Sequence, residues 1–212
     1  DRQNYLFFSV GERGKMQEAQ NLAVPQGKIH RLHDDGRVPS DNPFVGRTNA
    51  WPSVWTYGNR NPQGLRIHPD TGDIWAVEHG PRGGDELNLI RKGANYGWPV
   101  ITYGINYNGT PITDKTEAPG MEQPVTYWVP SIAVSGLDIY LGSKFPRWKG
   151  NLFAGALAHQ KLVRIELSPG RKVVQQEILL EKQGRIRDVR CLKDGFIYVV
   201  YDEPGKIVRL VP

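Results

Sequence analysis

The sequence contains a single cysteine, Cys191, which excludes an internal disulfide bond and is interpreted as a small buried hydrophobic side chain. No stretch approaches about 18 consecutive apolar residues, so no transmembrane helix is expected. No window keeps an apolar period of 3.6 residues, and long helices are therefore not expected either. Asp1 is followed directly by strand-like sequence, and no signal peptide is visible.

Several catalytic and binding motifs are also absent. The histidines have neither the HxH nor the HExxH spacing of a catalytic zinc site, and the sequence has no GxSxG nucleophile turn and no phosphate-binding loop. The formal net charge is +5, but the basic residues are scattered and form no block. Nucleic-acid binding is therefore not expected, and a small anionic ligand explains the mild basic excess equally well.

What the sequence does contain is short apolar runs separated by glycine and proline. The 24 glycines, the 16 prolines and the many runs rich in Val, Ile, Tyr and Trp are typical of an all-β protein. Strands are predicted at 5–10, 28–32, 54–57, 65–68, 74–78, 137–140, 152–156, 162–167, 173–180, 186–190, 196–201 and 207–210.

An internal repeat refines this fold class. Residues 65–78 (LRIHPDTGDIWAVE) and 189–203 (VRCLKDGFIYVVYDE) each read as a strand, an Asp/Gly turn and a second strand, and 136–156 is a looser copy. Such units predict a β-propeller, with a β-sandwich as the alternative. Residues 1–11 match only the second half of the unit. We therefore expect one propeller domain that starts inside a blade, supplies roughly four blades and is preceded by further sequence.

Two pairs of polar residues are candidates for ligand binding. Arg60 and Asn61 place a charged fork beside a neutral donor in a turn, which suits an anionic or carbonyl-bearing ligand; a purely structural turn is the alternative. Arg185 and Arg187 share one face of a predicted strand, where like charges repel unless an anion lies between them. A solvated edge strand is the alternative for this second pair.

A third candidate is the glycine-rich loop GPRGGDE at 80–86. Its glycines let backbone carbonyls turn inward, and its carboxylates suit a hard cation such as Ca²⁺, although the spacing is not that of an EF-hand. A solvated acidic turn is the alternative. His79, which directly precedes the loop, is interpreted as a packing or supporting residue.

Nine segments of distinctive sequence follow one another in a collinear order along essentially the whole chain. They are GKIHRL, DDGRVPSDNPF, GNRNPQG, EHGPRGGDELN, GANYGWP, EQPVTYWVPSIAVSG, FPRWKGNLFAGAL, GRIRDVR and KDGFIYVVYDEPGKIVRL. Together they resemble the soluble quinoprotein sugar dehydrogenases, the glucose/sorbosone dehydrogenase family, and within it the bacterial aldose sugar dehydrogenase branch. The resemblance implies a six-bladed β-propeller that carries pyrroloquinoline quinone (PQQ) and Ca²⁺ on its top face, with this chain as its C-terminal part.

The resemblance also implies roles for individual residues. It assigns cofactor-binding roles to Arg60 and Asn61 at the quinone, to Arg185 and Arg187 at the PQQ carboxylates, and to Ser131 and Ala133 in the pocket lining. It assigns the carbonyls of Gly80 and Pro81 to the Ca²⁺ of the cofactor, and Glu86 with the Tyr96 carbonyl to a second, structural calcium.

Two departures from the family pattern are visible. A Lys that the family often places against PQQ is Ala158 here, and His159 or Lys161 is the candidate to compensate. The general-base histidine of the family matches no residue of this chain and is expected upstream of Asp1. No catalytic residue is therefore assigned within residues 1–212.

For the intact protein, the resemblance implies oxidation of an aldose at its anomeric carbon to a lactone, by hydride transfer to PQQ. The 212-residue chain alone is expected to be inactive. The family further implies a periplasmic or secreted location, an unidentified electron acceptor and a homodimer as one option. Two alternatives stay open: a non-catalytic propeller that binds sugar or protein, and a calcium-dependent lactonase, which would need more carboxylates than Asp85 and Glu86.

Overall fold

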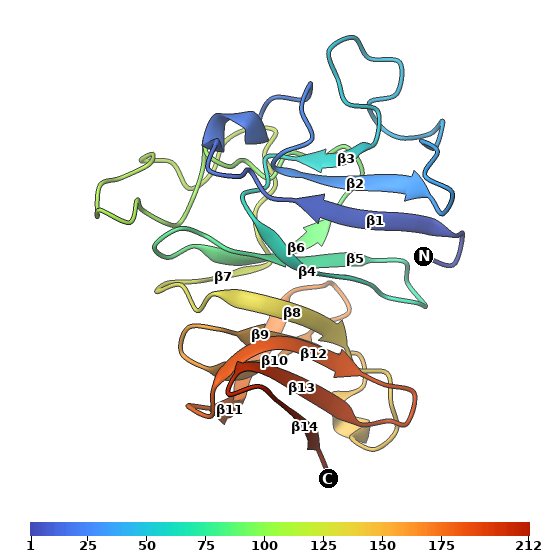
Figure 1. Cartoon of the computed structure of the whole chain (residues 1–212), viewed down its shortest axis with the longest axis vertical. Coiled ribbons are helices and arrows are strands. Elements are labelled where there is room, and N and C mark those ends of the chain that lie inside the picture. Colours follow the sequence, from blue (N-terminus) through green and yellow to red (C-terminus); the bar gives the residue numbers. More distant parts are fainter.

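The computed structural model describes residues 1–212 and consists mainly of β-strands and their connections. The strands form four antiparallel sheets that follow one another along the chain (Figure 1). Helical structure is limited to two short 3₁₀ turns, η1 (Met16–Ala19) and η2 (Pro146–Trp148). Neither turn has the length or the hydropathy of a membrane-spanning helix.

Each sheet is built from strands that are consecutive in sequence. The first contains β1 (Tyr5–Val10), β2 (Lys28–His33) and β3 (Val54–Tyr57). The second contains β4 (Pro62–Ile67), β5 (Ile74–Glu78), β6 (Asp85–Ile90) and β7 (Thr126–Trp128). The third contains β8 (Val134–Ile139), β9 (Leu152–Ala156), β10 (Lys161–Leu167) and β11 (Val173–Glu181). The fourth contains β12 (Arg185–Cys191), β13 (Ile197–Glu203) and β14 (Lys206–Leu210).

This succession of antiparallel sheets is the pattern of propeller blades and confirms the predicted all-β organisation in four blades. Closure of a six-bladed ring and the single-domain assignment stay predictions. Every predicted strand is present, but β6 and β7 were not predicted. The reason for β6 is that it begins with the acidic residues Asp85 and Glu86, which the sequence pattern assigned to a loop.

The core lies between successive sheets. Along β5, Trp75 and Val77 pack in a cluster shared with the third sheet, whereas Ile74 and Ala76 pack in a cluster shared with the first. Successive side chains of a strand point to opposite faces, so one strand contributes to both interfaces. All residues of β5 are buried for this reason.

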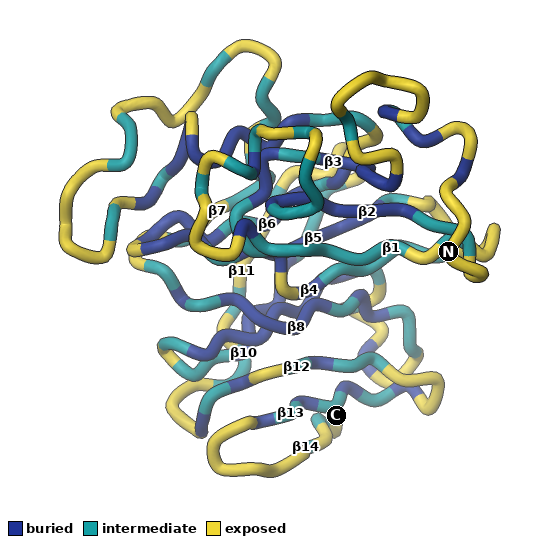
Figure 2. Tube along the Cα trace, turned by 45° about the horizontal axis from the view of Figure 1, so that its top comes forward, coloured by how far each residue is buried: buried dark blue, intermediate teal, exposed yellow.

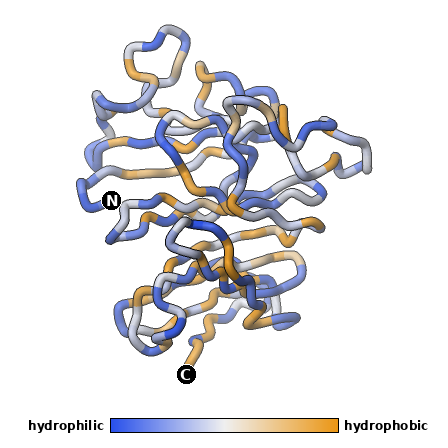
Figure 3. The backbone as a smooth tube through the Cα atoms, turned by 180° about the vertical axis from the view of Figure 1, so that it is seen from behind, coloured by the Kyte–Doolittle hydropathy of each residue, from blue (hydrophilic) through white to orange (hydrophobic).

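Burial and hydropathy both differ between the strands and the segments that connect them. Buried residues concentrate in the strands, while most exposed residues lie in the loops and turns (Figure 2). The hydropathy of the chain also alternates along the strands, with many of the most hydrophilic stretches at the connections (Figure 3). The connections are therefore where polar groups for a ligand are available.

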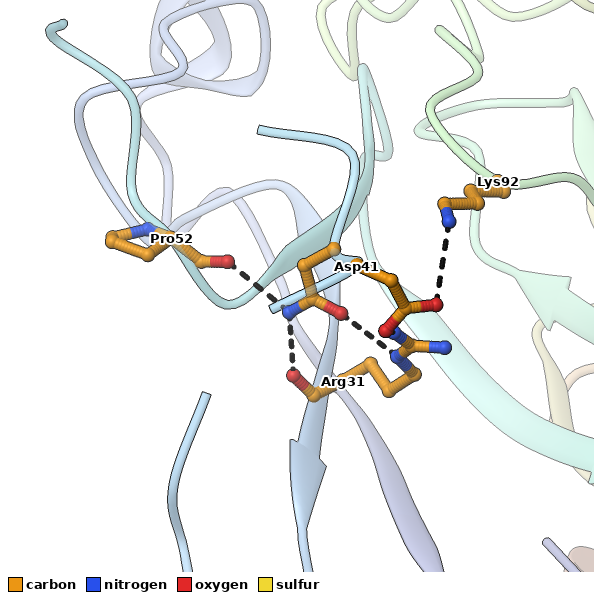
Figure 4. A network of polar contacts seen from close by, with 5 residues as sticks. Arg31, Asp41, Pro52 and Lys92 are labelled. Carbon is orange, nitrogen blue, oxygen red and sulfur yellow. Dashed lines mark hydrogen bonds and ion pairs between the residues drawn. The ribbon is translucent and has the colours of Figure 1, made fainter. Parts of the chain in front are cut away.

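The loop between β2 and β3 is fastened by the buried side chain of Arg31. Its guanidinium pairs with Asp41 and donates a hydrogen bond of 2.8 Å to the Asn42 amide, and Lys92 approaches Asp41 to 3.5 Å (Figure 4). The same guanidinium lies 4.4 Å from the ring centroid of Trp55. These contacts compensate the burial of the charge and hold the loop against the first sheet.

Candidate functional site

Arg60 lies in the turn before β4 and points its guanidinium at the end of β5. Nη1 donates hydrogen bonds to the carbonyls of His79, at 3.0 Å, and Gly80, at 2.9 Å. The guanidinium lies 5.4 Å from the ring of Trp98, and Nη2 lies 3.5 Å from the hydroxyl of the exposed Tyr107. Nε is buried and has no hydrogen-bond partner, so one donor of Arg60 is left over.

Asn61 is held mainly through its backbone. Its carbonyl accepts a hydrogen bond of 3.1 Å from the His79 N–H, while its side chain is half-buried. A Cβ at Gly11 would lie 2.6 Å from the Asn61 side-chain oxygen, so Gly11 leaves the space that this amide occupies. The turn predicted to contact the quinone is therefore packed against both β1 and β5.

A buried carboxylate, Glu78, lies beneath this turn. It is 5% exposed and accepts hydrogen bonds from the backbone N–H of Arg60 at 2.7 Å and from the side-chain amides of Asn59 at 3.2 Å and Asn88 at 3.0 Å. Burial raises the pKa of Glu78, and the N–H donors of Arg60, Asn59 and Asn61 oppose that shift.

Glu86 lies directly opposite Glu78 in the register of β5 and β6. Like charges placed opposite each other in a sheet are destabilising. Burial and then the neighbouring Glu78 raise the pKa of Glu86 to about 8, and the Asn88 amide, 3.1 Å from Glu86, offsets only part of this. The pair of carboxylates has no cationic side chain of its own as an ion-pair partner, so an additional cation is what this geometry favours.

One small cavity brings several predicted site residues together. Its lining includes Arg60, Gly80, Glu86 and Tyr96, that is, members of both the predicted cofactor set and the predicted metal set. The Tyr96 hydroxyl is used elsewhere, since it donates to the Leu89 carbonyl at 2.7 Å. The Tyr96 hydroxyl is therefore not free to bind a cation, and the role of the Tyr96 carbonyl as a ligand stays a prediction.

The loop at 80–84 is shaped by Asp85. This fully buried carboxylate accepts hydrogen bonds from the N–H of Gly80 at 2.9 Å and of Val134 at 3.2 Å, and from the Ser131 hydroxyl. A Cβ at Gly80 would lie 2.2 Å from the Gly83 carbonyl, so the loop closes tightly only with glycine there. Asp85 thus links the predicted calcium loop to the predicted pocket segment 131–134.

Ala133, the other predicted residue of this segment, has a left-handed backbone with φ of 53°. For a residue with a Cβ this conformation is strained, and such strain is often found at functional sites. Its carbonyl accepts a hydrogen bond of 2.9 Å from Leu157 N–H, which connects the segment to the end of β9.

Arg185 and Arg187 share one counter-ion, Asp202. Arg187 Nη2 lies 2.7 Å from its carboxylate and Arg185 Nε lies 3.4 Å away. The pairing of β12 with β13 is irregular between Ile186 and Asp188, where Arg187 bulges out of register. The anion that the arginine pair was expected to require is therefore at least partly supplied by the chain itself.

His79 lies between the Arg60 turn and the loop at 80–84, and its pKa is lowered. Burial lowers its pKa most; Asp85 raises it, and both Arg60 and Arg187 lower it further. Residues far apart in the sequence do meet in a second cavity, whose lining includes Ser9, Gln63, Ser135 and Arg187, one from each of the four sheets. Nε2 of His79 is buried without a hydrogen-bond partner.

No group of three or more His, Cys, Asp or Glu side chains that could hold a metal ion is present. Any cation would therefore depend on backbone carbonyls, as predicted for Gly80, Pro81 and Tyr96. The motifs did not point to three residues that organise the site, Glu78, Asn88 and Tyr107, and Asp85 was named only as a carboxylate of the candidate calcium loop. The sequence does contain a feature that could have identified Glu78, because this carboxylate ends an otherwise apolar strand (IWAVE).

Comparison with known proteins matches residues 1–209 to the family described as Glucose / Sorbosone dehydrogenase. The chain is 45% identical to the aldose sugar dehydrogenase YliI of Escherichia coli, over 100% of this chain and 58% of that protein. It superposes with a TM-score of 0.95 on a crystal structure of a glucose dehydrogenase, at 49% identity, with 100% of this chain and 62% of the other covered.

A more distant solved relative is the PQQ-bound form of an aldose sugar dehydrogenase from Streptomyces coelicolor. It is 29% identical with a TM-score of 0.75, covering 98% of this chain and 58% of that one. The chain therefore spans about three fifths of the length of the relatives that it matches.

Proposed function

The chain belongs to the glucose/sorbosone dehydrogenase family, and from this premise we propose that the intact protein oxidises aldose sugars with PQQ and Ca²⁺. The observation that carries the proposal is the small cavity that Arg60, Gly80, Glu86 and Tyr96 line together, in which the Arg60 guanidinium donates to the Gly80 carbonyl. A cationic donor and oxygen atoms suited to a hard cation lie together there. A scaffold without a ligand does not need this combination of groups around one cavity.

The arginines suit a cofactor that carries carboxylates. Arg60 has a buried, unpartnered Nε, and the half-exposed guanidiniums of Arg185 and Arg187 share Asp202 as their nearest carboxylate. Arginine pairs with carboxylates through paired hydrogen bonds. We assign Arg185 and Arg187 to the PQQ carboxylates, Arg60 and Asn61 to its quinone edge, and Ser131 and Ala133 to the pocket wall.

The calcium assignments rest on oxygen donors. A carbonyl oxygen has two lone pairs, so the Gly80 carbonyl accepts the Arg60 hydrogen bond and still has a lone pair for a cation. We place the cofactor calcium at Gly80 and Pro81. A second calcium at Glu86 and the Tyr96 carbonyl would neutralise the opposed carboxylates of Glu78 and Glu86.

The reaction removes a hydride from the anomeric carbon of the sugar and a proton from its hydroxyl group, and leaves the lactone. PQQ, when bound, supplies the quinone carbon that accepts the hydride. Arg60 and Asn61 stabilise the negative charge that develops beside them. The proton goes to a general-base histidine, which we expect upstream of Asp1, so the 212-residue chain alone is expected to be inactive. A periplasmic or secreted location remains part of the proposal.

A cofactor titration tests the proposal. The full-length protein in CaCl₂ is titrated with PQQ, and the cofactor absorbance is followed alongside an Arg187→Ala variant. We expect micromolar or tighter binding that the variant weakens. Absence of binding by the full-length protein at micromolar PQQ would instead favour the non-catalytic sugar- or protein-binding propeller.

A further inference from the structure

The side chains of Glu78 and Arg60 each form hydrogen bonds to the main chain at or next to the other residue. The Glu78 carboxylate accepts the backbone N–H of Arg60 at 2.7 Å, and the Arg60 guanidinium donates to the carbonyls of His79 and Gly80, the two residues after Glu78. Each residue thus uses its side chain to fix the main chain at the other. We call this arrangement, formed by Glu78 and Arg60, the reciprocal clamp.

The two oxygens of Glu78 have different partners. Oε2 accepts the Arg60 N–H, whereas Oε1 accepts the side-chain amides of Asn59 and Asn88. Asn59 is itself held by the buried Thr56 hydroxyl, which donates to it at 3.0 Å. The carboxylate is therefore fixed from both sides, by the turn that follows β3 and by β6, and cannot turn without losing a buried hydrogen bond.

We propose that Glu78 is a positioning residue for the cofactor site, which sets the Arg60–Asn61 turn and the Gly80 carbonyl through the reciprocal clamp. The inference rests on the proposed function, because the clamp holds the residues assigned there to PQQ and Ca²⁺. Glu78 is not proposed to contact the cofactor; it acts only through Arg60 and the turn that contains Arg60.

The chemistry of the donors explains why a carboxylate is required. Every hydrogen bond that Glu78 accepts comes from an N–H donor, and an ionised carboxylate is an acceptor at both oxygens. A glutamine of the same shape would turn an NH₂ group toward one of these donors. Burying a carboxylate opposite Glu86 is costly, so a residue serving packing alone would be better replaced by an apolar one.

The test uses the full-length protein with Glu78→Gln, Glu78→Asp and, as the matched control, Leu152→Ala. Leu152 is fully buried in β9, outside the clamp, so its truncation should lower the melting temperature while leaving PQQ affinity within about twofold. We expect Glu78→Gln to weaken PQQ binding at saturating Ca²⁺ by at least about tenfold, and Glu78→Asp to weaken it less. Wild-type affinity in Glu78→Gln would overturn the proposal.

A second readout needs no cofactor. In the PQQ-free protein, the amide resonance of Arg60 should shift strongly in Glu78→Gln and not in Leu152→Ala, because only the first change alters its acceptor. If the wild type itself binds no PQQ, the proposed function fails while this resonance still decides the clamp. If neither Glu78 variant folds, hydrogen exchange in the wild type decides: slow exchange at Arg60, comparable to that of β5, supports the clamp, and fast exchange contradicts it.

Discussion

The Arg60 guanidinium donates a hydrogen bond of 2.9 Å to the Gly80 carbonyl. A residue assigned to the quinone and a residue assigned to calcium are therefore joined by the fold itself. The contact arises because Pro62 pairs with Glu78 at the open end of the β4–β5 hairpin, which brings residue 60 beside residues 79 and 80.

Arg60→Lys should test how much this geometry matters. Lysine keeps the positive charge, and its ammonium group can replace Nη1, which donates to both carbonyls, but the lysine side chain lacks the Nε and Nη2 donors of the planar guanidinium. We expect PQQ affinity to fall by about tenfold or more, measured by absorbance titration of the full-length protein. Retention of wild-type affinity by the lysine variant would contradict a geometric role for the guanidinium.

Glu86→Gln should remove the response to calcium at the second site. The substitution relieves the repulsion from Glu78 in calcium-free protein, so its melting temperature should equal or exceed that of the wild type without calcium. Added CaCl₂ should then raise the melting temperature of the wild type and not of the variant, apart from any contribution of the cofactor. Differential scanning calorimetry with and without a chelator gives both values; equal calcium responses would place the cation elsewhere.

Asp202→Asn should strengthen PQQ binding. Asp202 competes with a ligand carboxylate for Arg185 and Arg187, and its removal leaves both guanidiniums without this counter-ion. Affinity measured at constant ionic strength should rise by a few-fold, while Asp194→Asn, a surface carboxylate bonded to Tyr198, should have no effect. Weaker binding in Asp202→Asn would mean that Asp202 orients the arginines more than it competes.

Lys28 should make stability depend on alkaline pH. Its side chain is buried, with Nζ donating to the carbonyls of Glu18, Ala19 and Gln26, and burial lowers its pKa from 10.5 to about 8, which Glu18 only partly opposes. Between these two pH values the unfolded chain binds more protons than the folded one, so stability rises with pH across this window.

Across this pH window, the free energy of unfolding is expected to rise by up to about 3 kcal/mol because of Lys28. Urea unfolding of the wild type and of Lys28→Met at a series of pH values isolates this rise, because other groups titrate equally in both proteins. Lys28→Met should be less stable throughout, since three carbonyls lose their donor. A difference between the two proteins that does not change with pH would contradict the lowered pKa.

The fold and part of the site were predictable because their signals are local. Alternating apolar residues and Asp/Gly turns define hairpins such as β4–β5, and that hairpin alone brings Arg60 to Gly80. The strand β6 was not predicted because it begins with acidic residues. Its first residue, Asp85, can be buried only because Gly80, Ser131 and Val134 supply hydrogen-bond donors to its carboxylate. Without β6, the strand register that places Glu78 directly opposite Glu86 could not be predicted either.

The sequence by itself determined the succession of antiparallel sheets and the polar turns that carry Arg60, Asn61 and the loop at 80–86, since periodicity and turn chemistry act over a few residues. Only the tertiary structure decided that Arg187 lines a cavity with residues of the other three sheets, that Asp202 lies between two arginines, and that Glu78 holds Arg60. These contacts depend on strand register and on packing between sheets, which no short stretch of sequence encodes.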